Sequence, residues 1–171
     1  MRCFLLPILG LALCCAQAQD RNNTDFIRSA ESIHFGLGVG LDHGGYGLRV
    51  DVPVDKHIGF FAGGGYALAG IGWNAGAVIR LMPAERWCPY LTAMYGYNTA
   101  LVVRNASEHN TLYYGPSFGA GVEMRRRKGP GFWHFGILRT DRPSEVEDDR
   151  IRFAASDPPP VLVSVGYHFG L

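Results

Sequence analysis

The sequence predicts an all-β fold: an eight-stranded antiparallel up-and-down transmembrane β-barrel, with its apolar face outward and a Gly-rich polar lumen. Three observations support this prediction. Apolar residues alternate with a period of two from Ile33 to the C-terminus. The apolar face of each predicted strand carries no charge. Most of the 23 glycines fall on the opposite face, where a soluble sheet would carry lysine and glutamate.

The N-terminus has the pattern of a cleaved signal peptide. A positive start at Arg2 is followed by the apolar stretch 3–13 and by Ala16-Gln17-Ala18, which matches an A-x-A cleavage site. The alternatives are a membrane anchor, for which the apolar core is short, and a lipoprotein modified near Cys14 or Cys15. We therefore expect a signal peptide over 1–18, a short periplasmic segment over 19–31 and a barrel domain over 32–171.

Composition and charge exclude several classes of protein. A chain of 171 residues with 47% hydrophobic and 18% charged residues is one domain long and has ample apolar surface to bury, unlike a disordered chain. Removal of Arg2 with the signal peptide leaves 15 basic residues against 15 acidic ones, so a nucleic-acid partner is not expected. Cys88 is then the only cysteine, which excludes an internal disulfide and suggests a passive small apolar residue.

The alternation defines eight strands separated by turn signals. The first carries Ile33, Phe35, Leu37, Val39 and Leu41 on its apolar face, and it ends at the turn Asp42-His43-Gly44. The remaining strands are predicted over 46–52, 58–68, 73–81, 91–97, 112–124, 133–137 and 161–171, with breaks at 53–56, 82–86, 125–131 and in two polar loops.

The chemistry of the two faces points to a membrane. Glycine would make a poor outer shell in water, but it suits a narrow and crowded lumen. Large apolar side chains can occupy the outer face if that face meets lipid, where an arginine or lysine at mid-depth costs about 2–4 kcal/mol. About ten residues at roughly 3.3 Å each, tilted by about 40°, span roughly 25 Å, the apolar thickness of an outer membrane.

The closing strand carries the pattern polar-x-Gly-x-x-apolar-x-apolar at Ser164, Gly166, Phe169 and Leu171. With the signal peptide and the alternating strands, it resembles small bacterial outer-membrane barrels of the OmpA/OmpX type. The resemblance implies location in the bacterial outer membrane, both termini in the periplasm, contact with outer-membrane lipid and lipopolysaccharide, and insertion by the barrel-assembly machinery that reads the closing strand. Family members usually end in an aromatic residue, from which Leu171 departs. No cofactor is implied.

The predicted orientation sorts the aromatic residues and the loops. Two aromatic girdles are expected, a periplasmic one that includes Phe35 and Trp133 and an outer one that includes Tyr46 and Trp73. The outer end has two very short loops, near His43 and Gly70, a medium loop over 101–110 and a long loop over 140–160. Pro116 interrupts a strand, so we expect a β-bulge there.

A His-apolar-Gly repeat places four histidines at periplasmic strand ends, facing inward. Because the first, seventh and eighth strands are neighbours in a closed barrel, His34, His134 and His168 could approach one another and hold a metal. The competing interpretation is a polar rim, in which glycine makes room for each ring. We favour the rim, since no carboxylate or cysteine has ligand spacing with these histidines, and no metal is expected.

Four charged residues face inward near the same end: Arg49, Asp51, Arg80 and Glu123. Two positive and two negative groups in a narrow lumen favour a paired plug that closes the barrel, because an unpaired buried charge is costly. The alternative is a selectivity ring in a small pore. The interior of eight strands is just filled by side chains, which favours the plug.

Two other classes of function remain as alternatives. Some eight-stranded outer-membrane barrels are lipid A deacylases with a serine two residues after a histidine, and no histidine here has that spacing. We therefore expect no enzymatic activity. A soluble ligand-carrying barrel would need a roomy apolar interior, whereas the inward face is polar.

Two charged runs are expected to be solvated. The basic run 125–128 could touch phosphate headgroups, but a periplasmic turn is favoured. The acidic run 145–149 lacks the alternating ligands and the central glycine of a calcium loop. The expected function is thus a structural or surface-interaction barrel whose unidentified extracellular partner contacts the loop over 140–160.

Overall fold

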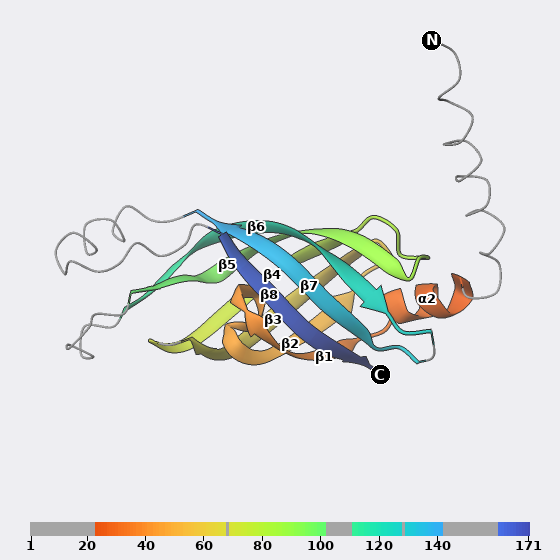
Figure 1. Ribbon diagram of the computed structural model, residues 1–171, viewed down its shortest axis with the longest axis horizontal. Helices are drawn as coiled ribbons and strands as arrows, with labels where there is room; N and C mark the ends of the chain where they lie inside the picture. Colours follow the sequence, from red (N-terminus) through yellow and green to blue (C-terminus); the bar gives the residue numbers. More distant parts are fainter. Residues whose placement is uncertain (1–22, 68, 102–110, 128, 142–160) are drawn as a thin grey trace, which may run out of the picture.

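The computed structural model describes residues 23–67, 69–101, 111–127, 129–141 and 161–171. The predicted signal peptide over 1–18, nearly all of the two longer predicted loops and the acidic run 145–149 lie outside these residues. The described chain forms a closed barrel of eight antiparallel strands in sequence order (Figure 1). This confirms the predicted all-β up-and-down barrel.

The eight strands have the following bounds, and one short helix precedes them: α2 Asn23–Ala30, β1 His34–Gly40, β2 Gly45–Pro53, β3 Ile58–Ala67, β4 Gly70–Arg80, β5 Trp87–Leu101, β6 Thr111–Arg125, β7 Phe132–Thr140 and β8 Val161–Gly170. Each strand pairs with the next, and β1 closes the barrel on β8 from His34 opposite Gly170 to Val39 opposite Val165. From Val165 to Gly170, this closure leaves no open sheet edge on β8. We call the end that holds α2 and Leu171 the terminal end and the opposite end the loop end.

The period-two alternation is present in the burial of every strand. In β7, for example, Phe132, His134, Gly136, Leu138 and Thr140 are buried, whereas the residues between them are exposed. Exposed apolar side chains cover the outer face from Phe35 on β1 to Phe169 on β8, and Ile71 is 79% exposed. The outward assignment of the apolar face is therefore correct along the strands.

Strand β7 is longer than predicted. It continues from Ile137 to Thr140 and thereby places Arg139 on the outer face. Arg139 is the one charged residue on the outward face of the described strands, so the expectation of a face without charge is wrong at this position. The sequence missed it because the alternation of apolar residues stops at Ile137, while the hydrogen-bonded ladder continues to Arg139 opposite Val161.

The β-bulge expected at Pro116 lies elsewhere. Pro116 pairs in register with Tyr95, and the register shift falls between Tyr97 and Thr99 of β5. The Pro116 carbonyl accepts a hydrogen bond from the backbone N–H of Asp141, just beyond β7. The N–H and C=O of a strand residue point to the same neighbouring strand. The N–H that proline lacks would therefore point to the end of β7, and the hydrogen-bond ladder between β6 and β5 stays intact.

The turn after β1 folds into the barrel, contrary to its prediction as a short outer loop. Leu41–His43 form one turn of 3-10 helix, η1, and all three residues are buried. Leu41, expected on the apolar outer face, is 2% exposed because η1 turns inward. A Cβ at Gly47 or Gly63 would collide with the backbone of η1, so the glycines of β2 and β3 provide the space for it.

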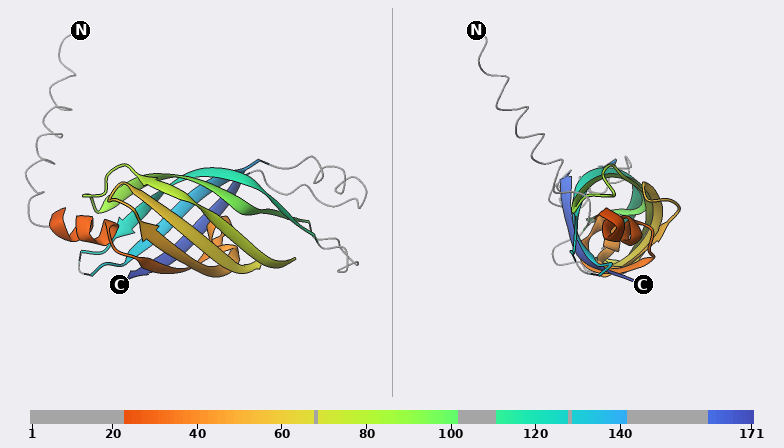
Figure 2. Two further views of the ribbon diagram at one scale, coloured as in Figure 1. Left: turned by 180° about the vertical axis from the view of Figure 1, so that it is seen from behind. Right: turned by 90° about the vertical axis from the view of Figure 1, so that its right-hand side faces the viewer.

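Helix α2 lies across the mouth of the barrel at the terminal end. Viewed along the barrel, it sits inside the ring of strands (Figure 2, right). Phe26, Ser29 and Ala30 are buried, and the Ser29 hydroxyl donates to the Pro130 carbonyl at 3.0 Å. In the described chain, no helix is long and apolar enough to cross a membrane.

Candidate functional site

The lumen of the barrel holds six charged side chains that are almost completely buried. Three are basic and three are acidic, and they come from η1, β2, β4 and β6: Asp42, Arg49, Asp51, Arg80, Glu123 and Arg125. With all six ionised, the cluster is neutral, which limits the cost of burying charge. We call these six residues the lumen network; they include the four predicted from the sequence.

The first half of the network centres on Arg49. Its Nη2 donates to Asp51 Oδ1 at 2.6 Å, and its Nη1 donates to Asp42 Oδ2. The guanidinium also lies over the ring of Phe61, with Cζ 3.8 Å from the ring centroid. Arg49 thereby ties η1 to the wall of β2. The sequence missed Asp42 because its turn signal suggested an exposed loop.

The second half centres on Glu123, which binds two arginines. Arg80 Nε donates to Glu123 Oε1 at 2.9 Å, and Arg125 Nη2 donates to Oε2 at 2.7 Å. Arg125 Nη1 also donates to the Phe26 carbonyl of α2 at 2.8 Å. The prediction that Arg125 belongs to a solvated turn is wrong, since it continues the inward alternation of β6 after Glu123 and is 1% exposed.

The histidines meet in a different set from the predicted one. His134 and His168 have ring centroids 5.4 Å apart, and the third ring of the group is His43 of η1, at 6.0 and 5.6 Å from them. His34 lies beyond the ring of Phe132, and its Nε2 is 2.8 Å from the Pro130 carbonyl oxygen. His57, the remaining member of the repeat, contacts the Arg80 carbonyl through Nδ1.

The histidines are joined to the lumen network by carboxylates. His134 Nε2 lies 2.9 Å from Asp42 Oδ2, and His168 Nδ1 lies 2.9 Å from Asp51 Oδ2. Tyr90 stacks on His134, and its hydroxyl lies 3.0 Å from Nε2. Among the described residues, no group of histidine, cysteine and carboxylate side chains has an arrangement that could hold a metal ion.

The lumen is not polar throughout. Leu41, Phe61, Met94 and Leu138 form a buried apolar cluster, with Tyr97 and Leu162 packed against it. Leu41 brings η1 into this cluster, while Asp42 and His43 of the same turn belong to the polar contacts. The turn therefore joins an apolar part of the interior to a charged one. The alternation of the fifth predicted strand already places Met94 on the inner face, whereas Leu41 was expected on the outer face and Leu138 lies beyond the predicted end of its strand.

No serine of the described chain is hydrogen-bonded to a histidine. Ser164 donates to Asp42 Oδ1, and Asp42 lies between this serine and the imidazole of His43. Ser117, on the inner face of β6, is completely buried. The arrangement lacks the serine–histidine contact of an activated nucleophile.

The residues of the closing-strand pattern fall on both faces of β8. Ser164 is buried in the lumen, and Gly166 faces inward, where a Cβ would lie 2.7 Å from His43 Nε2. Phe169 and Leu171 are exposed at the terminal end, and Leu171 is 82% exposed. The only cysteine of the described residues, Cys88, is buried on the inner face of β5, opposite Glu123 in β6.

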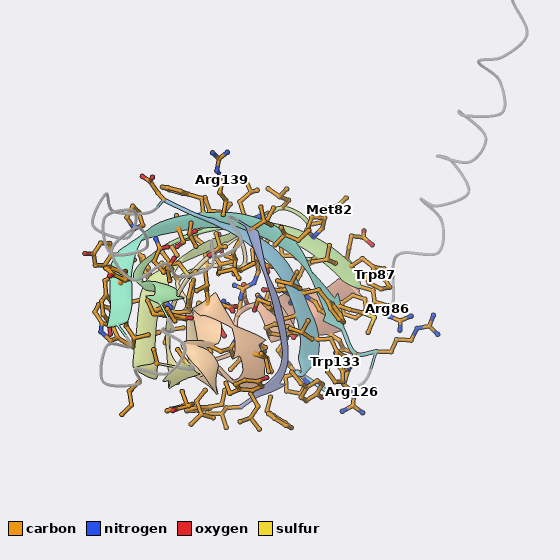
Figure 3. All side chains as sticks on the ribbon, turned by 60° about the vertical axis from the view of Figure 1, so that its left-hand side comes forward. Met82, Arg86, Trp87, Arg126, Trp133 and Arg139 are labelled. Carbon is orange, nitrogen blue, oxygen red and sulfur yellow. The ribbon has the colours of Figure 1, made fainter. Side chains whose placement is uncertain are left out.

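Exposed basic and aromatic side chains gather at the terminal end. Arg86, Arg126, Trp87 and Trp133 project there, whereas Arg139 projects from β7 at the other end (Figure 3). The expected aromatic girdle at this end includes Trp133 and Tyr167, whose ring centroids are 5.0 Å apart. At the loop end, Trp73 and Tyr114 are 5.7 Å apart.

Comparison with known proteins supports the fold. No family model matches the chain, and no curated protein matches it. Among solved structures, it is similar to the crystal structure of the N-terminal β-barrel domain of Pseudomonas aeruginosa OprF, with a TM-score of 0.52 and 10% sequence identity over 82% of this chain and 98% of that chain. The resemblance to small barrels of the OmpA type, expected from the sequence, is confirmed at the level of the fold.

Proposed function

We propose that the chain is an integral outer-membrane β-barrel with a closed lumen, which acts as a structural or surface-interaction element and not as an enzyme. The observation that carries this proposal is the contrast between the two faces of one sheet. Large apolar side chains are exposed all around the barrel, while six charged side chains are buried inside it.

The outer face supports insertion into lipid. A continuous apolar surface of this extent would drive aggregation in water. Within a bilayer, backbone N–H and C=O groups need partners inside the protein, and a closed barrel provides them. The similarity to an outer-membrane barrel domain in fold, together with the predicted signal peptide, favours the bacterial outer membrane and contact with its lipid and lipopolysaccharide.

Three layers support a closed lumen. Helix α2 covers the terminal end, one half of the lumen network joins β2 to η1, and the other half joins β4 to β6. Each arginine of the network contacts a carboxylate, so opening a water-filled path would separate several buried ion pairs. A small pore is the competing function. The exposed Phe169 and Leu171 remain the proposed contacts for the barrel-assembly machinery.

Two measurements test this proposal. Mature protein overexpressed in bacteria is expected to sediment with the outer-membrane fraction and to migrate differently on a gel before and after heating. Liposomes that contain it are expected not to swell in solutions of small sugars. Monodisperse protein in detergent-free buffer would contradict the membrane location, and rapid swelling would contradict the closed lumen in favour of the pore.

A further inference from the structure

The wall of the barrel has a notch at the loop end, between β8 and β2. Pairing of β1 with β8 stops at Val39 opposite Val165, so residues 161–164 have only β7 as a hydrogen-bonded strand neighbour in the described chain. Beyond Gly40 the chain turns inward as η1, and it returns to the wall at Gly45. The notch is therefore the space that η1 vacates in the wall.

A cavity of about 250 Å³ occupies this notch. Some of its lining side chains belong to the exposed outer face, and others belong to the buried apolar cluster or pack against it. The outer ones are Val39, Tyr46, Tyr66 and Val163, and the inner ones are Leu41, Tyr97 and Leu162. A cavity lined by both faces of one sheet passes from the outside of the barrel toward its apolar interior.

The length of β1 places the notch at the depth of lipid chains. Seven residues at roughly 3.3 Å each, tilted by about 40°, rise about 18 Å, which is less than the roughly 25 Å of the apolar band. With His34 placed at the inner boundary of the band, the outer end of β1 finishes inside it. Within the described chain, the edge of β8 beside it has no strand partner, and hydrocarbon supplies none to its backbone groups.

Arg139 supplies a charge beside the notch. It lies on the outward face of β7, directly across from Val161 and diagonal to Val163, which lines the cavity. Diagonal neighbours of this kind are within reach of long side chains. Arg139 makes no ion pair within the described residues, and its side chain projects away from the barrel wall (Figure 3). A guanidinium in this position favours a phosphate or carboxylate at the membrane surface.

We propose that the notch binds one acyl chain of an anionic lipid from the outer leaflet, with the lipid phosphate against Arg139. The chain fills the apolar cavity, and the polar linkages of the lipid lie along the unpaired edge of residues 161–164. This inference rests on the proposed outer-membrane location. It is independent of the proposed closed lumen, because the notch lies in the wall at the loop end and its occupancy does not depend on the state of the lumen network.

Binding is tested by native mass spectrometry of the mature chain in a neutral detergent, with dodecyl phosphate as the probe. One retained probe per barrel is expected. Dodecyl trimethylammonium, with the same chain and opposite charge, and hexyl phosphate, with a shorter chain, are expected to bind at least about tenfold more weakly. Equal retention of all three, or none of dodecyl phosphate, would overturn the proposal without any variant.

Two pairs of variants locate the site. Two variants are each expected to lower retention of the probe about tenfold: Val163→Trp, which fills the cavity, and Arg139→Gln. Their matched controls at exposed positions toward the terminal end, Val52→Trp and Arg127→Gln, are expected to leave retention unchanged. Heat-modifiable migration checks folding, and Val163→Phe replaces the larger change if that variant does not fold. Equal binding by all variants, or a dimer of this chain in place of the bound probe, would overturn the assignment.

The source of the ligand is resolved in nanodiscs. One set of nanodiscs contains phosphatidylglycerol alone, and a second set contains lipopolysaccharide. The lipid that remains bound to the barrel after transfer to detergent is identified for each set. Retention of one lipopolysaccharide molecule, lost in Arg139→Gln, supports the proposed source. Preferential retention of phosphatidylglycerol would overturn the assignment to the lipid of the outer leaflet.

Discussion

At the scale of single residues, Glu123 is the carboxylate that two buried arginines of the lumen network share. It accepts hydrogen bonds from two arginines on different strands, whereas the Arg80 guanidinium pairs with no carboxylate other than Glu123 in the described part of the chain. Glu123→Ala is expected to lower the free energy of unfolding by about 3–5 kcal/mol, because two buried guanidinium groups lose their carboxylate. Equilibrium unfolding in urea, in lipid vesicles, measures this loss.

Arg80→Ala provides the comparison, because Glu123 keeps Arg125 as a partner in that variant. Its cost is expected to be smaller than that of Glu123→Ala. Glu31→Ala, at an exposed position next to α2, serves as the control and is expected to change stability by less than about 0.5 kcal/mol. Equal losses from Glu123→Ala and Glu31→Ala would show that the network contributes nothing to stability.

The residues that the sequence could not assign are those that depend on a turn. Four charged residues lie within alternating strands, so the alternation alone places their side chains inside the barrel: Arg49, Asp51, Arg80 and Glu123. Asp42 and His43 reach the lumen because η1 bends inward, and this bend depends on space created by glycines of β2 and β3, far away in the sequence. Local pattern carries no information about such a long-range fit. Arg125 is different, since continued alternation after Glu123 was a usable signal.

At the scale of elements, the strands have an outer face whose tolerance to charge depends on depth. Ala62 lies near the middle of β3, and Trp87 is exposed at the terminal end of β5. Ala62→Arg is expected to cost about 2–4 kcal/mol of folding free energy in lipid, whereas Trp87→Arg costs about 0–1 kcal/mol from its charge. Folding titrations into vesicles compare them, with Ala62→Leu as the uncharged control.

Equal damage from Ala62→Leu and Ala62→Arg would mean that size and not charge is limiting at this position. An equal loss of folding free energy in the two arginine variants would mean that the apolar band does not have the expected depth. The strands themselves were the part of the fold that the sequence predicted well, because each alternates independently of its neighbours. Their ends were predicted less well, as β7 and Arg139 illustrate.

Helix α2 is the second element with a measurable role. Cys88 lies on the inner face of β5 near the terminal end, close to the Arg125 side chain that donates to the Phe26 carbonyl. Deletion of residues 19–30 from the mature chain is expected to expose this thiol. We expect a water-soluble maleimide to label Cys88 at least about tenfold faster in the truncated barrel than in the intact one.

Labelling in denaturant controls for the intrinsic reactivity of the thiol, and heat-modifiable migration confirms that the truncated barrel is folded. A thiol that reacts equally slowly with and without α2 would contradict a covering role for the helix. Its packing could not be predicted from the sequence, because eight residues outside the alternating strands carry no signal for where they dock.

At the scale of the whole molecule, the fold and its closure follow from the alternation of apolar residues and from the number of strands. The filling of the lumen follows from the contacts of η1, α2 and the lumen network. In the proposed function, these contacts make the barrel a closed one and not a pore of the same topology. Similarity at 10% identity to another barrel establishes the common fold, and the account of the lumen rests on the contacts within this chain. The central claim is therefore that this lumen is closed to ions.

Single-channel recording in planar bilayers tests that claim most directly. The intact mature barrel is expected to show no steady conductance in 1 M potassium chloride, whereas folded Glu123→Ala barrels are expected to show flickering leak currents, since Arg80 and Arg125 then lose the carboxylate that joins them across the lumen. Large, steady and ion-selective conductance by the intact barrel would contradict the claim.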